Sequence, residues 1–130
     1  MKRILFAFAL ILLTAGVASA QQKEASIAAV DSTVYDFGNI KEADGAVTHT
    51  FKVKNEGEVP LVVTKVVASC GCTTPDWTKE PIAPGQTGEI KVTYDPTGRP
   101  NAFTKNISVY SNGKAGSFIF TIKGNVIPKN

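Results

Sequence analysis

Two cysteines are the residues of this chain best suited to chemistry. Cys70 and Cys72 are its only cysteines, and Gly71 alone separates them. Cα atoms two residues apart can come within the roughly 4.4–6.8 Å that disulfides span, and glycine most easily takes the backbone angles this requires. The spacing therefore permits a local disulfide. A bridge that closes so small a ring is strained, and strain favours exchange with other thiols, so a thiol–disulfide exchange protein is one alternative.

A metal site is the second alternative, and it needs more ligands than the two cysteines supply. His49 or Asp76 would add a third ligand. Zinc in a structural site takes four ligands, whereas copper(I) can be held almost entirely by two thiolates. The metal alternative is therefore copper(I) on Cys70, Cys72 and His49. Outside that alternative, the sequence predicts no metal and no cofactor.

The residue sets of the common catalytic classes are missing from the sequence. A nucleophile needs a base beside it, and His49 is the only histidine. His49 shares its strand parity with Phe51 and Val53, which places it on an inner face or at a sheet edge. Residues 95–98 (Asp-Pro-Thr-Gly) predict a turn, not an acid site. We therefore expect a protein that is not an enzyme.

The first twenty residues have the features of a secretory signal peptide. They begin with Lys2 and Arg3 and continue with an apolar run from Ile4 to Leu13. A small-residue cleavage signal, Ala18-Ser19-Ala20, follows. The apolar run is shorter than the roughly 20 residues that span a bilayer, so no membrane span is expected after cleavage. We expect the mature protein to be periplasmic or secreted.

Export changes the expectations for charge and for cysteine chemistry. Loss of Lys2 and Arg3 lowers the number of basic residues from 14 to 12, against 11 acidic ones, and leaves a net charge of +1. Such a balance, without a basic and aromatic patch, gives no basis for nucleic-acid binding. An oxidising compartment favours a disulfide between Cys70 and Cys72 over free thiols.

Segments of alternating apolar and polar residues, separated by turns, run through the rest of the chain. About seven such segments predict an all-β, antiparallel sandwich with an immunoglobulin-like fold. Leu61 and Val63 have one parity and Val66 the other, so a bulge is expected near Thr64-Lys65. No stretch after residue 20 has a helical apolar period, so any helix should be short. The main strands are expected at 33–37, 47–54, 61–68, 89–94, 103–109 and 118–122.

Several short motifs follow one another along this region. They are Asp36-Phe37-Gly38, Asn55-Glu56-Gly57, Cys70-Gly71-Cys72-Thr73, Pro84-Gly85, Tyr94-Asp95 and Ser111-Asn112. Together, over nearly all of Thr33–Val126, they resemble the bacterial domain of unknown function 1573. This resemblance implies an immunoglobulin-like sandwich, related in architecture to PapD-like and major-sperm-protein-like domains.

The expected organisation is a signal peptide at 1–20, a polar lead at 21–32, the sandwich at 33–127 and a tail at 128–130. A sandwich without catalytic residues can bind through its loops or through an unpaired edge strand. We therefore expect an interaction or scaffolding module of the cell envelope, whose partner is another envelope or secreted protein. The sequence predicts no oligomeric state. The expected partner-contact loop follows the cysteines and comprises Thr73, Thr74, Pro75, Asp76 and Trp77.

The signal sequence gives a first testable prediction. Exported protein should begin at Gln21, because the small-residue signal ends at Ala20. Mass analysis of the N-terminal peptide checks this. Exported protein that retained Met1 would contradict the assignment and would remove the compartment argument for an oxidised cysteine pair.

Overall fold

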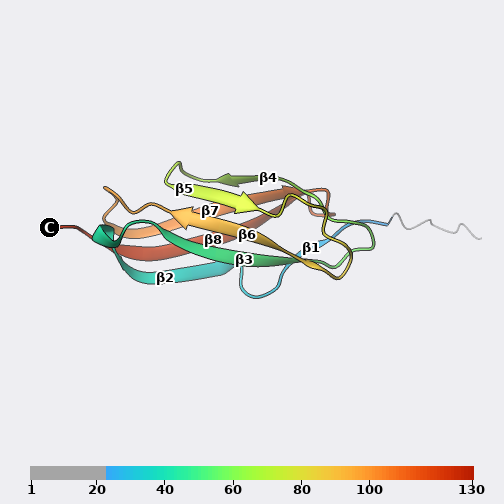
Figure 1. Cartoon of the computed structure of the whole chain (residues 1–130), viewed down its shortest axis with the longest axis horizontal. Coiled ribbons are helices and arrows are strands. Elements are labelled where there is room, and N and C mark those ends of the chain that lie inside the picture. Colours follow the sequence, from blue (N-terminus) through green and yellow to red (C-terminus); the bar gives the residue numbers. More distant parts are fainter. Residues whose placement is uncertain (1–22) are drawn as a thin grey trace, which may run out of the picture.

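The computed structural model describes residues 23–130, and the expected signal peptide lies outside the described residues. Figure 1 shows strands running lengthwise along an elongated, two-layer sandwich. Besides the strands, residues 23–130 contain one short 3₁₀ helix, η1 (Glu42–Asp44). Within residues 23–130, no helix has the length and apolar character to cross a bilayer. The strands are β1 (Ile27–Ala29), β2 (Val34–Lys41), β3 (Val47–Asn55), β4 (Val63–Ala68), β5 (Thr73–Trp77), β6 (Thr87–Tyr94), β7 (Asn101–Ser111) and β8 (Ser117–Ile127).

Two four-stranded sheets form the layers. One has the strand order β1-β3-β6-β5, and the other has the order β2-β8-β7-β4. The all-β sandwich is therefore confirmed, with eight strands in residues 23–130 where about seven were expected. The expectation of a wholly antiparallel fold is wrong, because β2 runs parallel to β8.

The parallel pair arises from the way in which the chain divides its first strand between the two sheets. Residues 27–29, expected to belong to a polar lead, form β1 and pair with the end of β3. The chain then crosses to the other sheet. The N–H of Val30 still donates to the carbonyl of Lys52 (3.0 Å), whereas the carbonyl of Thr33 already accepts from the N–H of Thr121 (2.8 Å). Strand β2 continues from there beside β8.

The alternation of residue types sets the inner and outer faces as expected. On β3, Phe51 is buried in the core while its neighbour Lys52 is exposed. The register of β4 against β7 shifts between Val63 and Lys65, which confirms the bulge expected near Thr64-Lys65. A bulge changes the parity of a strand, so apolar side chains on both sides of it reach the core.

Aromatic side chains join the two layers across the core. Phe51 of β3 stacks on Phe120 of β8 with ring centroids 4.4 Å apart. Tyr94 of β6 stacks on Phe103 of β7 at 4.0 Å. Gly124 leaves room for the second pair, because a Cβ atom at this position would lie 2.8 Å from two atoms of the Phe103 ring. Stacked pairs of this kind add to the free energy gained from burial alone.

One fully buried polar side chain, that of Asn55, ties several segments together at the end of β3. Its Oδ1 atom accepts hydrogen bonds from the N–H groups of Ser26 (3.3 Å) and Gly57 (2.9 Å). Its Nδ2 atom donates to the carbonyls of Val59 (2.7 Å) and Ile82 (2.9 Å). Within the described chain, no buried side-chain nitrogen or oxygen lacks a partner. Asn55 is the first residue of the Asn55-Glu56-Gly57 motif, and its side chain fixes the loops around the turn that follows β3.

The register gives a second testable prediction. Phe120→Ala should lower the free energy of unfolding by about 3–5 kcal/mol, because the side chain is fully buried and its loss leaves a cavity. Lys52→Ala, on the outer face of β3, is the control and should change it by less than about 0.5 kcal/mol. Urea unfolding of both variants measures the difference. A large loss from Lys52→Ala would show that the inner and outer faces are exchanged.

Candidate functional site

The two cysteines lie in the connection that carries the chain from one sheet to the other. Strand β4 ends at Ala68 and β5 begins at Thr73, so residues 69–72, here called the cysteine turn, cross between the layers. The N–H of Ser69 donates to the carbonyl of Asn106 (2.9 Å) on β7. The carbonyl of Cys72 accepts from the N–H of Asp95 (2.9 Å). The turn is therefore anchored to one sheet at each end.

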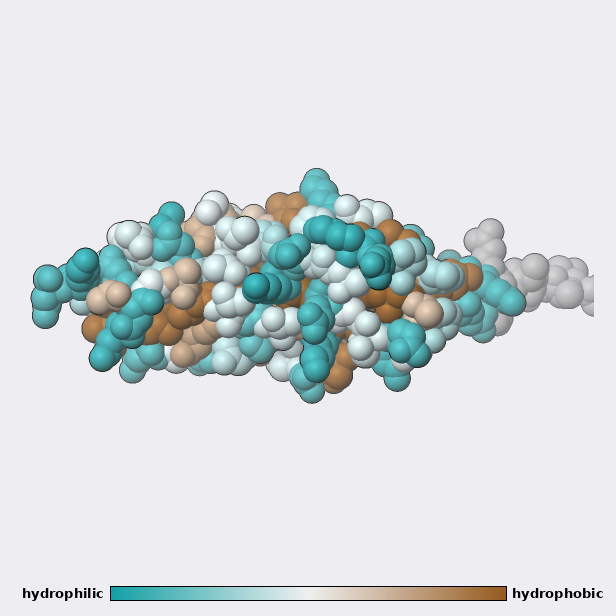
Figure 2. Space-filling model, in the orientation of Figure 1, coloured by the Kyte–Doolittle hydropathy of each residue, from teal (hydrophilic) through white to brown (hydrophobic). Residues whose placement is uncertain are grey.

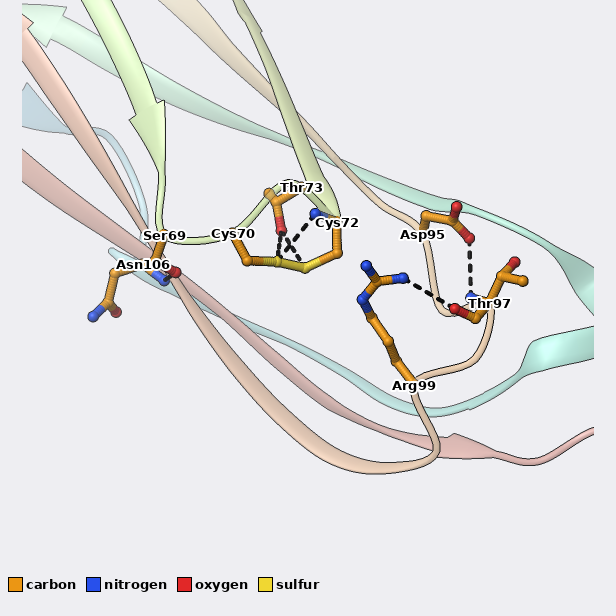
Figure 3. Close-up of a disulfide and its surroundings, with 8 residues drawn as sticks. All are labelled: Ser69, Cys70, Cys72, Thr73, Asp95, Thr97, Arg99 and Asn106. Carbon is orange, nitrogen blue, oxygen red and sulfur yellow. Dashed lines mark hydrogen bonds between the residues drawn. A yellow bond between two sulfur atoms is a disulfide. The ribbon is translucent and has the colours of Figure 1, made fainter.

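Within the cysteine turn the structure joins Cys70 and Cys72 as a disulfide, with Cα atoms 5.3 Å apart (Figure 3). The N–H of Cys72 donates to Cys70 Sγ (3.1 Å), and the carbonyl of Cys70 accepts from the N–H of Thr73 (3.2 Å). The two residues differ in exposure: Cys72 is 4% exposed, whereas Cys70 is half-buried. The geometry agrees with the spacing argument. Oxidation in the native compartment stays a prediction.

One side-chain hydroxyl group lies close to both sulfur atoms. Thr73 Oγ1 lies 3.7 Å from Cys72 Sγ and 4.0 Å from Cys70 Sγ. The Asp95–Arg99 loop runs past the cysteine turn, and Figure 3 shows the Arg99 guanidinium extending toward the disulfide. Arg99 is fixed in part by its Nη1 atom, which donates to the carbonyl of Thr97 (3.0 Å). Hydrogen bonds from Thr97 lower the pKa of Asp95 below its usual value.

Thr73–Trp77, the expected partner-contact loop, form strand β5 at the edge of a sheet, so the expectation of a loop is wrong. Their contact with a partner stays a prediction. Pro75 and Asp76 favour a turn in the sequence, but β5 pairs with β6 along its whole length. Pro75 can occupy an edge strand because its missing N–H is not needed on the solvent side. Trp77 is half-buried against the core, and Lys79 Nζ lies 3.0 Å from its ring centroid. Trp77 thus covers the sandwich from this strand.

The outer edge of β5 has few free donors. The N–H of Thr78, just after β5, donates to the carbonyl of Glu89 on β6 (3.0 Å). Backbone groups alternate in direction along a strand, so those of Trp77, Pro75 and Thr73 face away from β6. Of these three, Pro75 has no N–H. The N–H of Trp77 donates to Asp76 Oδ1 (2.9 Å), and that of Thr73 donates within the cysteine turn. A further strand would find no free donor on this edge.

The structure does not bring His49 to the cysteines. His49 lies on β3, and β6 separates β3 from β5 and the cysteine turn. Its ring stacks on that of Tyr35 with centroids 3.6 Å apart. Within the part of the chain that the structure describes, no three His, Cys, Asp or Glu residues are grouped to hold a metal. Copper(I) binding by Cys70, Cys72 and His49 together therefore has no support from the geometry.

A second candidate site lies where β2 and β3 face each other at the opposite side of the sandwich, here called the β2–β3 seam. A cavity of about 120 Å³ opens there. Val34 and Tyr35, which line it, are 43% and 37% exposed, and Val30, just before them in the chain, is 44% exposed. Figure 2 shows hydrophobic side chains on the lower margin of the molecule, where Figure 1 draws β2 and β3. The lining residues of the cavity include Asp31, Tyr35, His49, Thr50, Phe51 and Lys52.

Part of β3 has an unpaired edge at the β2–β3 seam. Strand β1 pairs only with residues 53–55, and Val30 adds one hydrogen bond to the carbonyl of Lys52. The backbone groups of Lys52 therefore point away from β6. By alternation, the backbone groups of Thr50 and Thr48 do the same. Among residues 23–130, no strand pairs with this part of β3 on that side. The sequence did not predict this free edge, and the shortness of the apolar segment 27–29 was its only sign.

The fold and these two features define an immunoglobulin-like, PapD-like sandwich with a cysteine turn between its sheets. The family described as Protein of unknown function (DUF1573) matches residues 28–126, and the chain belongs to this family. The match confirms the resemblance drawn from the motifs. Comparison with curated proteins finds no match.

Solved structures show the same fold at low sequence identity. A protein of unknown function from Porphyromonas gingivalis is 20% identical, with a TM-score of 0.68, and the match covers 79% of this chain and 47% of that one. The human CEP192 PapD-like domain 7 is 8% identical, with a TM-score of 0.65 and 82% and 89% coverage. Vibrio cholerae VesB protease is 17% identical, with a TM-score of 0.58 and 79% and 31% coverage. This chain thus spans about half of the Porphyromonas chain.

The position of His49 gives a third testable prediction. Burial lowers the pKa of His49 below its usual value, so the unfolded chain binds the proton more readily than the folded one. Stability should therefore fall as the pH is lowered through about 6.5 toward the folded-state pKa. Melting temperatures of wild type and His49→Gln across this range measure the effect, which should be a few degrees at most. Two other charged residues, Asp31 and Lys52, line the same cavity. Both are present in the wild type and in the His49→Gln variant, so the comparison isolates the histidine. An equal fall in both would contradict the assignment.

Proposed function

We propose that this protein is an exported interaction module of the bacterial cell envelope that binds an extended segment of another protein along the β2–β3 seam. The unpaired edge of β3 carries the proposal. Thr48 and Thr50 present backbone N–H and C=O groups there, and a segment laid beside them in β conformation would satisfy these groups.

The apolar character of the β2–β3 seam supports the same mode of binding. Alternate side chains of an added strand point to one face, so every second residue of the bound segment would lie over the exposed apolar side chains of Val34 and Tyr35. Main-chain hydrogen bonds would supply affinity and the apolar contacts would supply selectivity. The partner is therefore expected to contribute a short segment with apolar residues at alternate positions.

The other edge of the same sheet does not offer an equivalent site. On β5, Pro75 has no donor and the N–H of Trp77 is held by Asp76. On the second sheet, β4 is interrupted by its bulge at Val63 to Lys65. Natural proteins use proline and bulges in this way to prevent unwanted pairing at sheet edges. The half of β3 that lacks such protection is the edge best suited to accept a partner.

Placement in the envelope rests on the sequence. The signal sequence at residues 1–20 favours export, and a bacterial cell directs exported soluble proteins to the periplasm or beyond. Family membership and the PapD-like sandwich are in keeping with a binding role, although the fold alone assigns no function.

Two matched variants test the binding site. Val34 lines the β2–β3 seam and is 43% exposed, whereas Val67 is 40% exposed and lies on β4 at the other side of its sheet. Partners are captured from an envelope fraction with the mature wild-type protein, identified by mass spectrometry and then measured singly. Val34→Lys should weaken binding by at least about tenfold, because it sets a charge in an apolar contact. Val67→Lys should leave binding within about twofold.

Amide hydrogen exchange identifies the edge that is used. Binding should slow exchange at the N–H groups of Thr48 and Thr50, because these groups become hydrogen-bonded in the complex. Trp77 N–H, already held by Asp76, should change little. Equal weakening by both lysine variants, or unchanged exchange at Thr48 and Thr50 in the complex, would refute binding at the β2–β3 seam.

A further inference from the structure

The cysteine turn has a structural asymmetry that binding at the β2–β3 seam does not explain. Cys70 is half-buried, whereas Cys72 is 4% exposed and belongs to the core. Attack on Cys70 Sγ displaces Cys72, so an external thiol must approach from the side opposite Cys72, and Cys70 is the more exposed of the two residues. The two cysteines are therefore not equivalent toward an external thiol.

We propose that Cys70 and Cys72 are a thiol–disulfide exchange couple for dithiols of other proteins, in which Cys70 is the sulfur that bonds to the substrate and Cys72 is the enclosed second sulfur. The inference does not depend on the proposed function, because the cysteine turn lies between β4 and β5 and the β2–β3 seam lies at the opposite edges of the two sheets.

The exchange balances with a dithiol as the only co-reactant. A thiolate of the substrate attacks Cys70 Sγ, the Cys70–Cys72 bond breaks, and Cys72 leaves as a thiolate that takes a proton from water. A mixed disulfide then links Cys70 to the substrate. The second thiol of the substrate loses its proton and attacks the substrate sulfur of this bond, which releases Cys70 as a thiolate. The substrate has lost two electrons and become a disulfide, and Cys70 and Cys72 have gained them.

A hydrogen-bond donor in the turn is directed at Cys70 Sγ, where it would stabilise the charge of a Cys70 thiolate. The N–H of Cys72 donates to Cys70 Sγ (3.1 Å), and Thr73 Oγ1 lies 4.0 Å from the same atom. Donors that bond to the charged form lower the pKa of a group. A stabilised Cys70 thiolate is a better leaving group in the second step, and it can attack a disulfide in the reverse reaction. These donors belong to the turn itself and need no movement of the sheets.

Arg99, an exposed residue, brings a positive charge to the neighbourhood of the cysteine turn, and Figure 3 draws its guanidinium on the Cys72 side of the disulfide. Its guanidinium extends toward the disulfide in Figure 3, from a loop that is fixed to Cys72 through the hydrogen bond from Asp95 N–H to the Cys72 carbonyl. The charge of Arg99 also acts on Tyr94, the residue of β6 that pairs with Thr73. Burial raises the pKa of Tyr94, and the positive charge of Arg99 opposes that rise. A cation beside a thiol lowers the thiol pKa. The proposed role of Arg99 is thus to lower the pKa of the thiol through its positive charge, without touching the substrate.

The fold should withstand the opening of the bridge. Strands β4 and β5 are each held by their own ladders, to β7 and to β6. The bridge closes a loop of three residues, so it removes little conformational freedom from the unfolded chain. Reduction therefore changes the cysteine turn without releasing the strands on either side. This property separates an exchange couple from a structural disulfide, whose loss would destabilise the domain.

The first test uses the oxidised wild-type mature protein and dithiothreitol as the dithiol probe. Reduction, followed by alkylation and mass analysis, should be at least about tenfold faster than the reduction of oxidised glutathione at the same pH, because a bridge that closes so small a ring exchanges readily. The melting temperature should be nearly the same in both redox states. Slow reduction, or unfolding on reduction, would overturn the proposal without the use of any variant.

The second test separates the two sulfur atoms with single-cysteine variants and oxidised glutathione as the probe. Cys72→Ser, which keeps Cys70, should form the mixed disulfide at least about tenfold faster than Cys70→Ser, with a pH midpoint below the ordinary cysteine value of about 8.5. Adding Arg99→Gln to Cys72→Ser should raise that midpoint, whereas Arg99→Lys should not. Lys114→Gln, on the exposed β7–β8 loop, is the matched control and should leave it unchanged. Equal rates of mixed-disulfide formation by the two single-cysteine variants would overturn the assignment. So would a pH midpoint that is unchanged by Arg99→Gln.

Two outcomes distinguish this proposal from the others. Partner binding at the β2–β3 seam should survive in the Cys70→Ser variant, so loss of exchange and loss of binding are separate results. Freshly isolated wild-type protein that held two thiols and bound copper(I) tightly would refute exchange in favour of a metal role for the cysteine turn.

Discussion

The side chain of Asn55 is the constraint on which the rest of this sandwich depends. It is fully buried at the end of β3, and its hydrogen bonds reach Ser26 before β1, the turn at Gly57, and the carbonyl of Ile82 before β6. A buried amide is stable only when its donors and acceptors are matched, so these segments are fixed in one arrangement. Because Ser26 is among them, Asn55 also sets where β1 begins to pair with β3.

The start of β1 determines how much of β3 is left unpaired. Strand β1 covers residues 53–55, and the chain then crosses to β8. Had the first strand stayed on one sheet, it would have covered the backbone of Thr48 and Thr50, and β8 would have lacked its parallel neighbour. The free edge of β3 is thus a result of dividing one strand between two layers. A single buried hydrogen-bonding residue and a short crossing define the β2–β3 seam together.

Much of this fold follows from local patterns in the sequence. The alternation around Phe51 and Lys52 predicts the face of β3, and the change of parity before Val66 predicts the bulge in β4, because both effects depend on neighbouring residues. Strand β1 and its pairing could not be predicted, since three residues carry too weak a pattern and their partners lie far along the chain. Pro75 suggested a loop, but an edge strand tolerates it. The spacing of Cys70 and Cys72 permits a bridge, but it gives no sign that Cys72 is the more enclosed of the two residues.

The blocked donors on β5 have a consequence for assembly. A chain of molecules joined edge to edge needs each unit to accept a neighbour on one side and to offer a free edge on the other. In the β1-β3-β6-β5 sheet, β3 can accept, but the N–H groups on the outer side of β5 are absent at Pro75 or already bonded at Trp77 and Thr73. Growth along this sheet would stop after one addition. A partner strand added at β3, as proposed, would therefore make the protein monovalent through this sheet.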